Sequence, residues 1–202
     1  MHRRKLIREG FKGFGGLIRQ AVQETKQARR DEAKPLNGPA DLFRPPGALP
    51  EHDFLNACTK CNDCMDACPH GVIYKHFDTY STANLTPVLS PSCMPCEMCE
   101  DTPCVTACDE GALILEENEK PKIGIARIYI DHCLTWTGEA ECTSCEELCP
   151  LPEKAIAADS QGRMRVKANL CDGCGHCTSH CPIGPDAIEI VALSNERTQP
   201  TD

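Results

Sequence analysis

Cysteine spacing is the feature that most limits how this chain can fold. The chain has 202 residues and seventeen cysteines, of which sixteen lie in four groups of four. The groups are Cys58, Cys61, Cys64 and Cys68; Cys96, Cys99, Cys104 and Cys108; Cys133, Cys142, Cys145 and Cys149; and Cys171, Cys174, Cys177 and Cys181. The first and last have the spacing C-x2-C-x2-C-x3-C-P. In that pattern three cysteines bind one [4Fe–4S] cube and the fourth binds the other cube of a two-cluster unit.

The two middle groups are variants of this pattern. The second widens one spacer to residues 100–103 and has Asp109 in place of the usual proline. The third places residues 134–141 between its first two cysteines and is followed by Pro150. Each still offers three cysteines for one cube and one for a partner cube. We therefore predict that all sixteen cysteines are cofactor-binding residues, serving as iron ligands of four [4Fe–4S] clusters.

Other uses of cysteine fit the spacing less well. Structural zinc usually takes two separated C-x2-C pairs, and disulfides need an oxidising compartment. Cysteines that only fill a core would not be spaced so evenly. Cys93 is the one left over: it could replace Cys96 or another ligand of the second group, but we favour a spare, partly buried thiol.

Composition and charge restrict the function further. Aromatic residues make up only 4% of the chain, so a large apolar core is not expected. The clusters must therefore hold the fold together, and the metal-free chain should be mostly unfolded. Residues 1–30 have nine Lys and Arg and two Glu, a net charge of +7. Because the whole chain has −9, residues 31–202 carry −16. This acidic body argues against nucleic acid and suits docking to basic patches on redox partner proteins.

The chain divides into four parts by pattern. Residues 1–34 predict a basic amphipathic helical extension, residues 35–53 a Pro/Gly-rich linker, residues 54–193 a four-cluster ferredoxin domain, and residues 194–202 a polar tail. Short apolar runs flank the cysteine groups, at residues 72–73, 112–114, 128–130, 155–156, 164–166 and 188–191. They predict repeated units of strand, cysteine loop, short helical turn and strand. The predicted fold class is α+β, with tandem bacterial dicluster ferredoxin-like modules in two pseudo-twofold units.

Four stretches carry a resemblance to a known family. They are residues 44–49 (Arg-Pro-Pro-Gly-Ala-Leu), residues 95–104, the insert of the third group, and residues 171–175 (Cys-Asp-Gly-Cys-Gly). With these motifs the chain resembles the NapG/MauM-type ferredoxins, polyferredoxins of periplasmic nitrate reductase and methylamine utilisation systems. The resemblance implies four [4Fe–4S] clusters that relay electrons between a quinol-side or soluble donor and a terminal reductase or oxidase. It also implies a twin-arginine leader and a periplasmic location.

The N-terminal segment predicts a different location. Arg3 and Arg4 are a twin-arginine pair, but Lys12 and Arg19 interrupt the apolar stretch that export requires. We expect residues 1–30 to be retained and to contact a partner or, as a peripheral element, a membrane surface. The predicted location is cytoplasmic, and membrane association through residues 1–30 is left open beside contact with a partner. The alternative is the periplasm, if residues 1–30 act as a twin-arginine signal.

The assignment of cysteines to cubes rests on analogy with four-cluster electron-transfer subunits. That analogy pairs the first group with the fourth and the second with the third. The expected sets are Cys58, Cys61, Cys64 with Cys181; Cys171, Cys174, Cys177 with Cys68; Cys96, Cys99, Cys104 with Cys149; and Cys133, Cys142, Cys145 with Cys108. The alternative pairs neighbouring groups, and the similar gaps between groups leave both open.

Residues beside the ligands are expected to have supporting roles. Four histidines, His70, His132, His176 and His180, are interpreted as surface or second-layer residues, because each group already has four cysteines. Trp136 is expected to shield a cluster, dock a partner or pack. Gly173 and Gly175 are expected to let the backbone approach a cube closely.

The predicted function is electron transfer and not enzymatic catalysis. The sequence offers no nucleophile with a base and no phosphate-binding glycine loop. We predict an iron–sulfur subunit that relays electrons between a redox donor and a catalytic oxidoreductase. The alternative is an assembly ferredoxin that binds an apo-oxidoreductase and assists its maturation.

Overall fold

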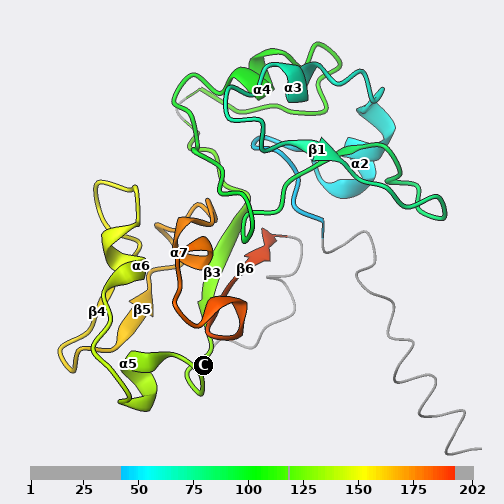
Figure 1. Cartoon of the computed structure of the whole chain (residues 1–202). Helices are drawn as coiled ribbons and strands as arrows, with labels where there is room; N and C mark the ends of the chain where they lie inside the picture. The colour runs from blue at the N-terminus through cyan, green and yellow to red at the C-terminus, as the bar shows by residue number, and fades with distance from the viewer. Residues whose placement is uncertain (1–41, 118, 194–202) are drawn as a thin grey trace, which may run out of the picture. The chain divides into compact units, whose positions relative to one another are not determined.

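The computed structural model describes residues 42–117 and 119–193, which form a small α+β fold (Figure 1). The helices are α2 (Glu51–Ala57), α3 (Asp63–Asp66), α4 (Pro103–Thr106), α5 (Leu134–Thr137), α6 (Ser144–Glu147) and α7 (His176–Ser179), with a 3-10 turn, η2 (Gly184–Asp186). The helix expected over residues 1–34 and the tail expected over residues 194–202 lie outside the described residues. Within the described part, no helix combines the length and apolar character needed to cross a membrane.

Short antiparallel strand pairs make up the β structure. The strands are β1 (Tyr74–Lys75), β2 (Pro87–Val88), β3 (Gly124–Ile128), β4 (Ile156–Ala158), β5 (Met164–Val166) and β6 (Ile188–Ala192). β1 pairs with β2, β4 with β5, and β3 with β6. In the longest pair, Gly124 lies opposite Ala192 and Ile128 opposite Ile188. This pairing joins segments that are far apart in the sequence.

The apolar runs predict the C-terminal strands better than the N-terminal ones. β5 coincides with residues 164–166, and β6 covers residues 188–191. Residues 72–73 do not form a strand; both side chains are buried, and the strand follows them as β1. Residues 112–114 contribute only an isolated bridge between Leu113 and Ala48. At residues 72–73 and 112–113, burial in the hydrophobic core, and not strand pairing, explains the apolar pattern.

The segment before α2 is part of the folded unit. Phe43 bridges Leu89, and Pro45 is fully buried. The guanidinium of Arg44 donates to both carboxylate oxygens of Glu51 at 2.9 and 2.6 Å, and it lies 4.5 Å from the centre of the Phe54 ring. The linker expected over residues 35–53 therefore extends too far. Its C-terminal part is anchored by these contacts, which composition alone does not reveal.

Buried residues form two hydrophobic clusters, and cysteines belong to both. The first cluster draws on residues between Phe54 and Ile123 and includes Cys64, Cys96 and Cys104. The second lies between Ala126 and Ile190 and includes Cys149, Cys171 and Cys177. Thiols make up three of the ten buried residues in the first cluster and three of the eight in the second, so they occupy positions that would otherwise hold core side chains.

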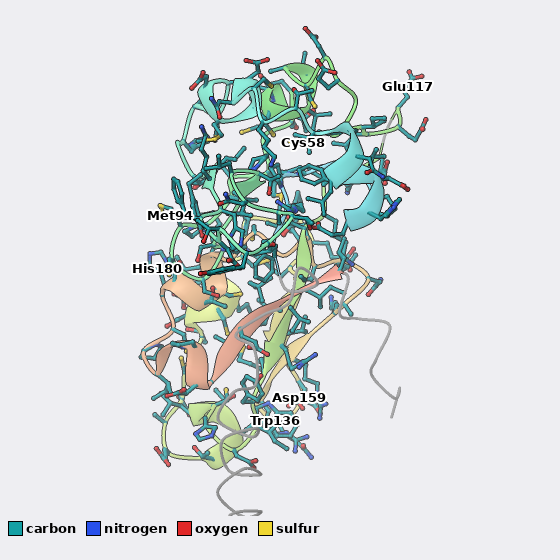
Figure 2. All side chains as sticks on the ribbon, turned by 90° about the vertical axis from the view of Figure 1, so that its right-hand side faces the viewer. Cys58, Met94, Glu117, Trp136, Asp159 and His180 are labelled. Atoms are coloured by element: carbon teal, nitrogen blue, oxygen red, sulfur yellow. The ribbon has the colours of Figure 1, made fainter. Side chains whose placement is uncertain are left out.

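The insert of the third cysteine group is tied to the β4–β5 hairpin. Trp136 in α5 donates from Nε1 to the carbonyl oxygen of Met164 at 2.8 Å. The guanidinium groups of Arg163 and Arg165 lie 4.6 and 4.8 Å from the centre of its ring, and both bind Asp159. Figure 2 shows Trp136 and Asp159 close together. Of the three roles expected for Trp136, the structure supports packing.

Candidate metal-cluster sites

In each cysteine group, a helix of four residues carries the third cysteine. Cys64 lies in α3, Cys104 in α4, Cys145 in α6 and Cys177 in α7. Three of these turns begin after a residue with positive φ: Asn62, Thr102 and Gly175. Such a residue bends the chain sharply, so that the cysteines on both sides of it face the same space.

Four cavities lie inside these bends, and four cysteines line each of them. The first site has Cys58, Cys61, Cys64 and Cys108; the second has Cys96, Cys99, Cys104 and Cys68; the third has Cys133, Cys142, Cys145 and Cys181; and the fourth has Cys171, Cys174, Cys177 and Cys149. Their volumes, including space open to solvent, are about 400, 390, 390 and 320 Å³ for the first, second, third and fourth sites respectively. Every site therefore takes three cysteines from one group and one from a neighbouring group.

This arrangement contradicts the expected pairing of groups. Cys68 lines the cavity of the second group and not that of the fourth, and Cys149 lines the cavity of the fourth and not that of the second. The reason is local packing: α3 lies beside α4, and α6 lies beside α7 (Figure 1). Because the fourth cysteine follows its helical turn directly, it reaches the site of the helix packed against that turn. The alternative, pairing of neighbouring groups, is the one that the structure has.

Apolar side chains complete the walls of the four sites. Examples are Phe54 and Leu113 in the first, Val72 and Ile73 in the second, Ile128 and Met164 in the third, and Ile156 and Ile190 in the fourth. The four thiols of each site line one cavity, which is the arrangement that a multi-atom cluster requires.

The thiols of each site disfavour negative charge while no cation is bound. Burial raises the pKa of Cys64 to about 12, and Cys108 from the neighbouring group is the strongest of the charges that raise it further. Burial raises the pKa of Cys104 to about 11, and Cys96 and Cys68 add to the shift. Burial is also the main cause of raised pKa values at Cys96, Cys145, Cys171, Cys174 and Cys177. Four such thiolates are stable together only around a positively charged group such as iron.

The leftover cysteine and the histidines stand apart from this ligand geometry. Cys93 is exposed, not partly buried as expected, and lines none of the four cavities. His132 and His180 are exposed, while His70 lies at the rim of the second site. The Nε2 atom of His176 lies 3.3 Å from Oε2 of Glu97, which connects the loop of the fourth site to the loop of the second.

The second and fourth sites meet through the backbone. The Cys96 N–H donates to the carbonyl oxygen of Cys174 at 2.8 Å. A Cβ on Gly175 would lie 2.1 Å from the carbonyl oxygen of Pro91, and a Cβ on Gly173 would lie 2.5 Å from the nitrogen of Gly124. These glycines thus permit close contact between two parts of the chain, where we expected contact with a cube. In the sequence, this contact is indicated by Gly173 and Gly175 alone.

We expect Gly175→Ala to lower the free energy of unfolding of the iron-loaded protein by about 2–4 kcal/mol, because it adds left-handed strain and a backbone clash. The matched control is Gly162→Ala, since Gly162 has φ +77° and a Cβ added to it would have no neighbour within 4 Å. That variant has the strain without the clash and should lose only about 1–2 kcal/mol. Denaturant unfolding measures both, and equal losses would contradict the close contact.

Comparison with known proteins shows that this chain is similar to iron–sulfur proteins. Residues 50–73 match the family model described as a 4Fe-4S binding domain. The chain is 36% identical to the methylamine utilization ferredoxin-type protein MauM of Methylorubrum extorquens, over 94% of this chain and 88% of that protein. It is 37% identical to MauM of Paracoccus denitrificans (90% and 81% covered) and 32% identical to the ferredoxin-type protein NapG of Escherichia coli (95% and 86% covered). No solved structure matches the chain significantly.

Proposed function

This chain belongs to the family of ferredoxin-type proteins that includes MauM and NapG, and from that premise we propose that it relays electrons through four [4Fe–4S] clusters between a redox donor and a catalytic oxidoreductase. The chain is an iron–sulfur electron carrier and not itself an enzyme. The observation that carries the four-cluster proposal is the presence of four cavities with four cysteines each.

The donor set of each site fits a cubane. Soft thiolate sulfur is the preferred ligand of iron–sulfur clusters, and four thiolates match the four irons of one cube. When bound, a [4Fe–4S] cluster takes up and releases single electrons. The cysteines would hold the group, and the apolar walls would limit the access of water to it. The sixteen cysteines are thus the proposed ligands, grouped as the cavities group them.

The helix pairs suggest how the sites are organised. The packing of α3 on α4 brings the first and second sites together, and the packing of α6 on α7 does the same for the third and fourth. We propose that each pair forms one dicluster ferredoxin-like module. The two hydrophobic clusters, which divide the described residues between Ile123 and Ala126, support this division.

Charge supports a protein partner. Residues 31–202 carry a net charge of −16, so the acidic body would be attracted to a basic patch on an oxidoreductase or its electron donor. We propose that residues 1–30, with a net charge of +7, contact either that partner or an anionic membrane surface from the cytoplasmic side. Fractionation of the native cell, followed by detection of the chain in cytoplasm, membrane and periplasm, tests the location.

Iron analysis and low-temperature EPR test the function. Anaerobically isolated protein should contain about sixteen irons per chain, and reduction with dithionite should produce S = 1/2 signals of interacting clusters. Cys93→Ala is the matched control: Cys93 is exposed and lines none of the four cavities, so its removal should leave the iron content unchanged. A colourless, diamagnetic zinc protein would refute the proposal.

A further inference from the structure

Asp172 is a buried carboxylate beside the fourth site. It follows Cys171 directly, lines the fourth cavity and is 8% exposed. One carboxylate oxygen accepts the N–H of Cys174 at 3.0 Å, which fixes the side chain next to the ligands. In the described residues, Asp172 forms no ion pair with Lys, Arg or His. A negative charge in such a place is only weakly screened by water.

The same carboxylate lies near a ligand loop of the second site, because Cys174, whose N–H it accepts, also contacts Cys96. The Cys96 N–H donates to the carbonyl oxygen of Cys174, so one hydrogen bond separates a ligand loop of the second site from a ligand loop of the fourth. After burial, Asp172 is the largest cause of the raised pKa of Cys174. It is also among the charges that, after burial, raise the pKa of Cys96. The field of Asp172 therefore reaches ligands of two sites.

We propose that Asp172 lowers the reduction potentials of the second and fourth sites together, at the contact through which electrons pass between the two halves of the chain. The inference rests on the proposed function. A fixed negative charge opposes the arrival of an electron, so it lowers the potential of any site that it faces. The contact also gives an order of transfer, first–second–fourth–third site, that differs from the order of the cysteine groups in the sequence.

The step at this contact moves one electron and no proton. One electron leaves one site, which is oxidised, and enters the other, which is reduced. Because Asp172 lowers both potentials, it changes the driving force between the two sites less than it changes their driving force against the first and third sites. Asp172 is therefore expected to make an electron less stable on the second and fourth sites than on the first and third. Electrons would then move on to the first and third sites.

The test is Asp172→Asn, which removes the charge and keeps an oxygen to accept the Cys174 N–H. In an anaerobic redox titration followed by EPR, two of the four midpoint potentials should rise, the fourth site's more than the second's. The matched control is Asp63→Asn, because Asp63 also adjoins a ligand, Cys64, but is more open to water. That variant should shift the potentials far less.

Variants that lack one cluster site identify which midpoint potentials Asp172→Asn shifts. With Cys99→Ala, which removes the second site, Asp172→Asn should shift one potential; with Cys61→Ala, which removes the first, it should still shift two. Wild-type protein without iron would refute the proposed function itself. Iron-loaded protein in which none, one, three or all four potentials move would overturn only this inference. If Asp172→Asn loses iron, Asp172→Ser replaces it, and loss of iron in both variants also overturns the inference, because Asp172 would then serve assembly.

Discussion

Removal of iron is expected to abolish the folded structure of residues 42–117 and 119–193. The four helices that carry third cysteines have four residues each, and the strands have two to five, so no element is stable alone. Thiols contribute three residues to each hydrophobic cluster. Without a cation, these thiols must be buried as neutral groups around a void, and little else remains to offset the loss of chain entropy.

Far-UV circular dichroism and amide hydrogen exchange measure this effect. After oxidation and chelation, the cooperative thermal transition should disappear, and amides such as those of Cys96 and Ile123, which donate backbone hydrogen bonds, should exchange like those of an unfolded chain. Reconstitution with iron and sulfide is the control and should restore both signals. A chelated chain that keeps its native spectrum and protected amides would mean that the fold does not depend on the clusters.

The sequence predicts the ligand residues far better than it predicts their partners. The spacing of each group requires a tight bend, so three cysteines that face one space follow from covalent geometry. Which group supplies the fourth cysteine depends on the packing of α3 on α4 and of α6 on α7, and the similar gaps between groups carry no information about it. The analogy with other four-cluster subunits selected the wrong alternative for this reason.

Two other features depend on contacts between distant residues. The burial of Arg44 depends on its contacts with Glu51, Thr86 and Phe54, which lie outside the Pro-rich pattern, so composition alone indicated a linker. The contact of Cys96 with Cys174 depends on backbone that is exposed by glycine, which has no side chain to form a pattern. Apolar periodicity did locate β5 and β6, because both strands bury alternate side chains.

Pairs of cysteine substitutions distinguish the two group pairings by iron content. If Cys68 completes the second site, as the cavity indicates, Cys68→Ala with Cys99→Ala empties one site and should leave about twelve irons of about sixteen. Cys68→Ala with Cys174→Ala then empties two sites and should leave about eight. Pairing of the first group with the fourth predicts the reverse, because Cys68 and Cys174 would share a site.

The single variants make this comparison interpretable. Cys68→Ala, Cys99→Ala and Cys174→Ala should each leave about twelve irons, which shows that loss of one site spares the other three. The effect of a second substitution is then read as additive or absent, in the way that a double-mutant cycle separates coupled residues from independent ones. If both double variants keep about twelve irons, Cys68 is not a ligand; if both keep about eight, Cys68 completes a site other than the second and the fourth. In either case the cavity around Cys96, Cys99 and Cys104 takes its fourth ligand from elsewhere.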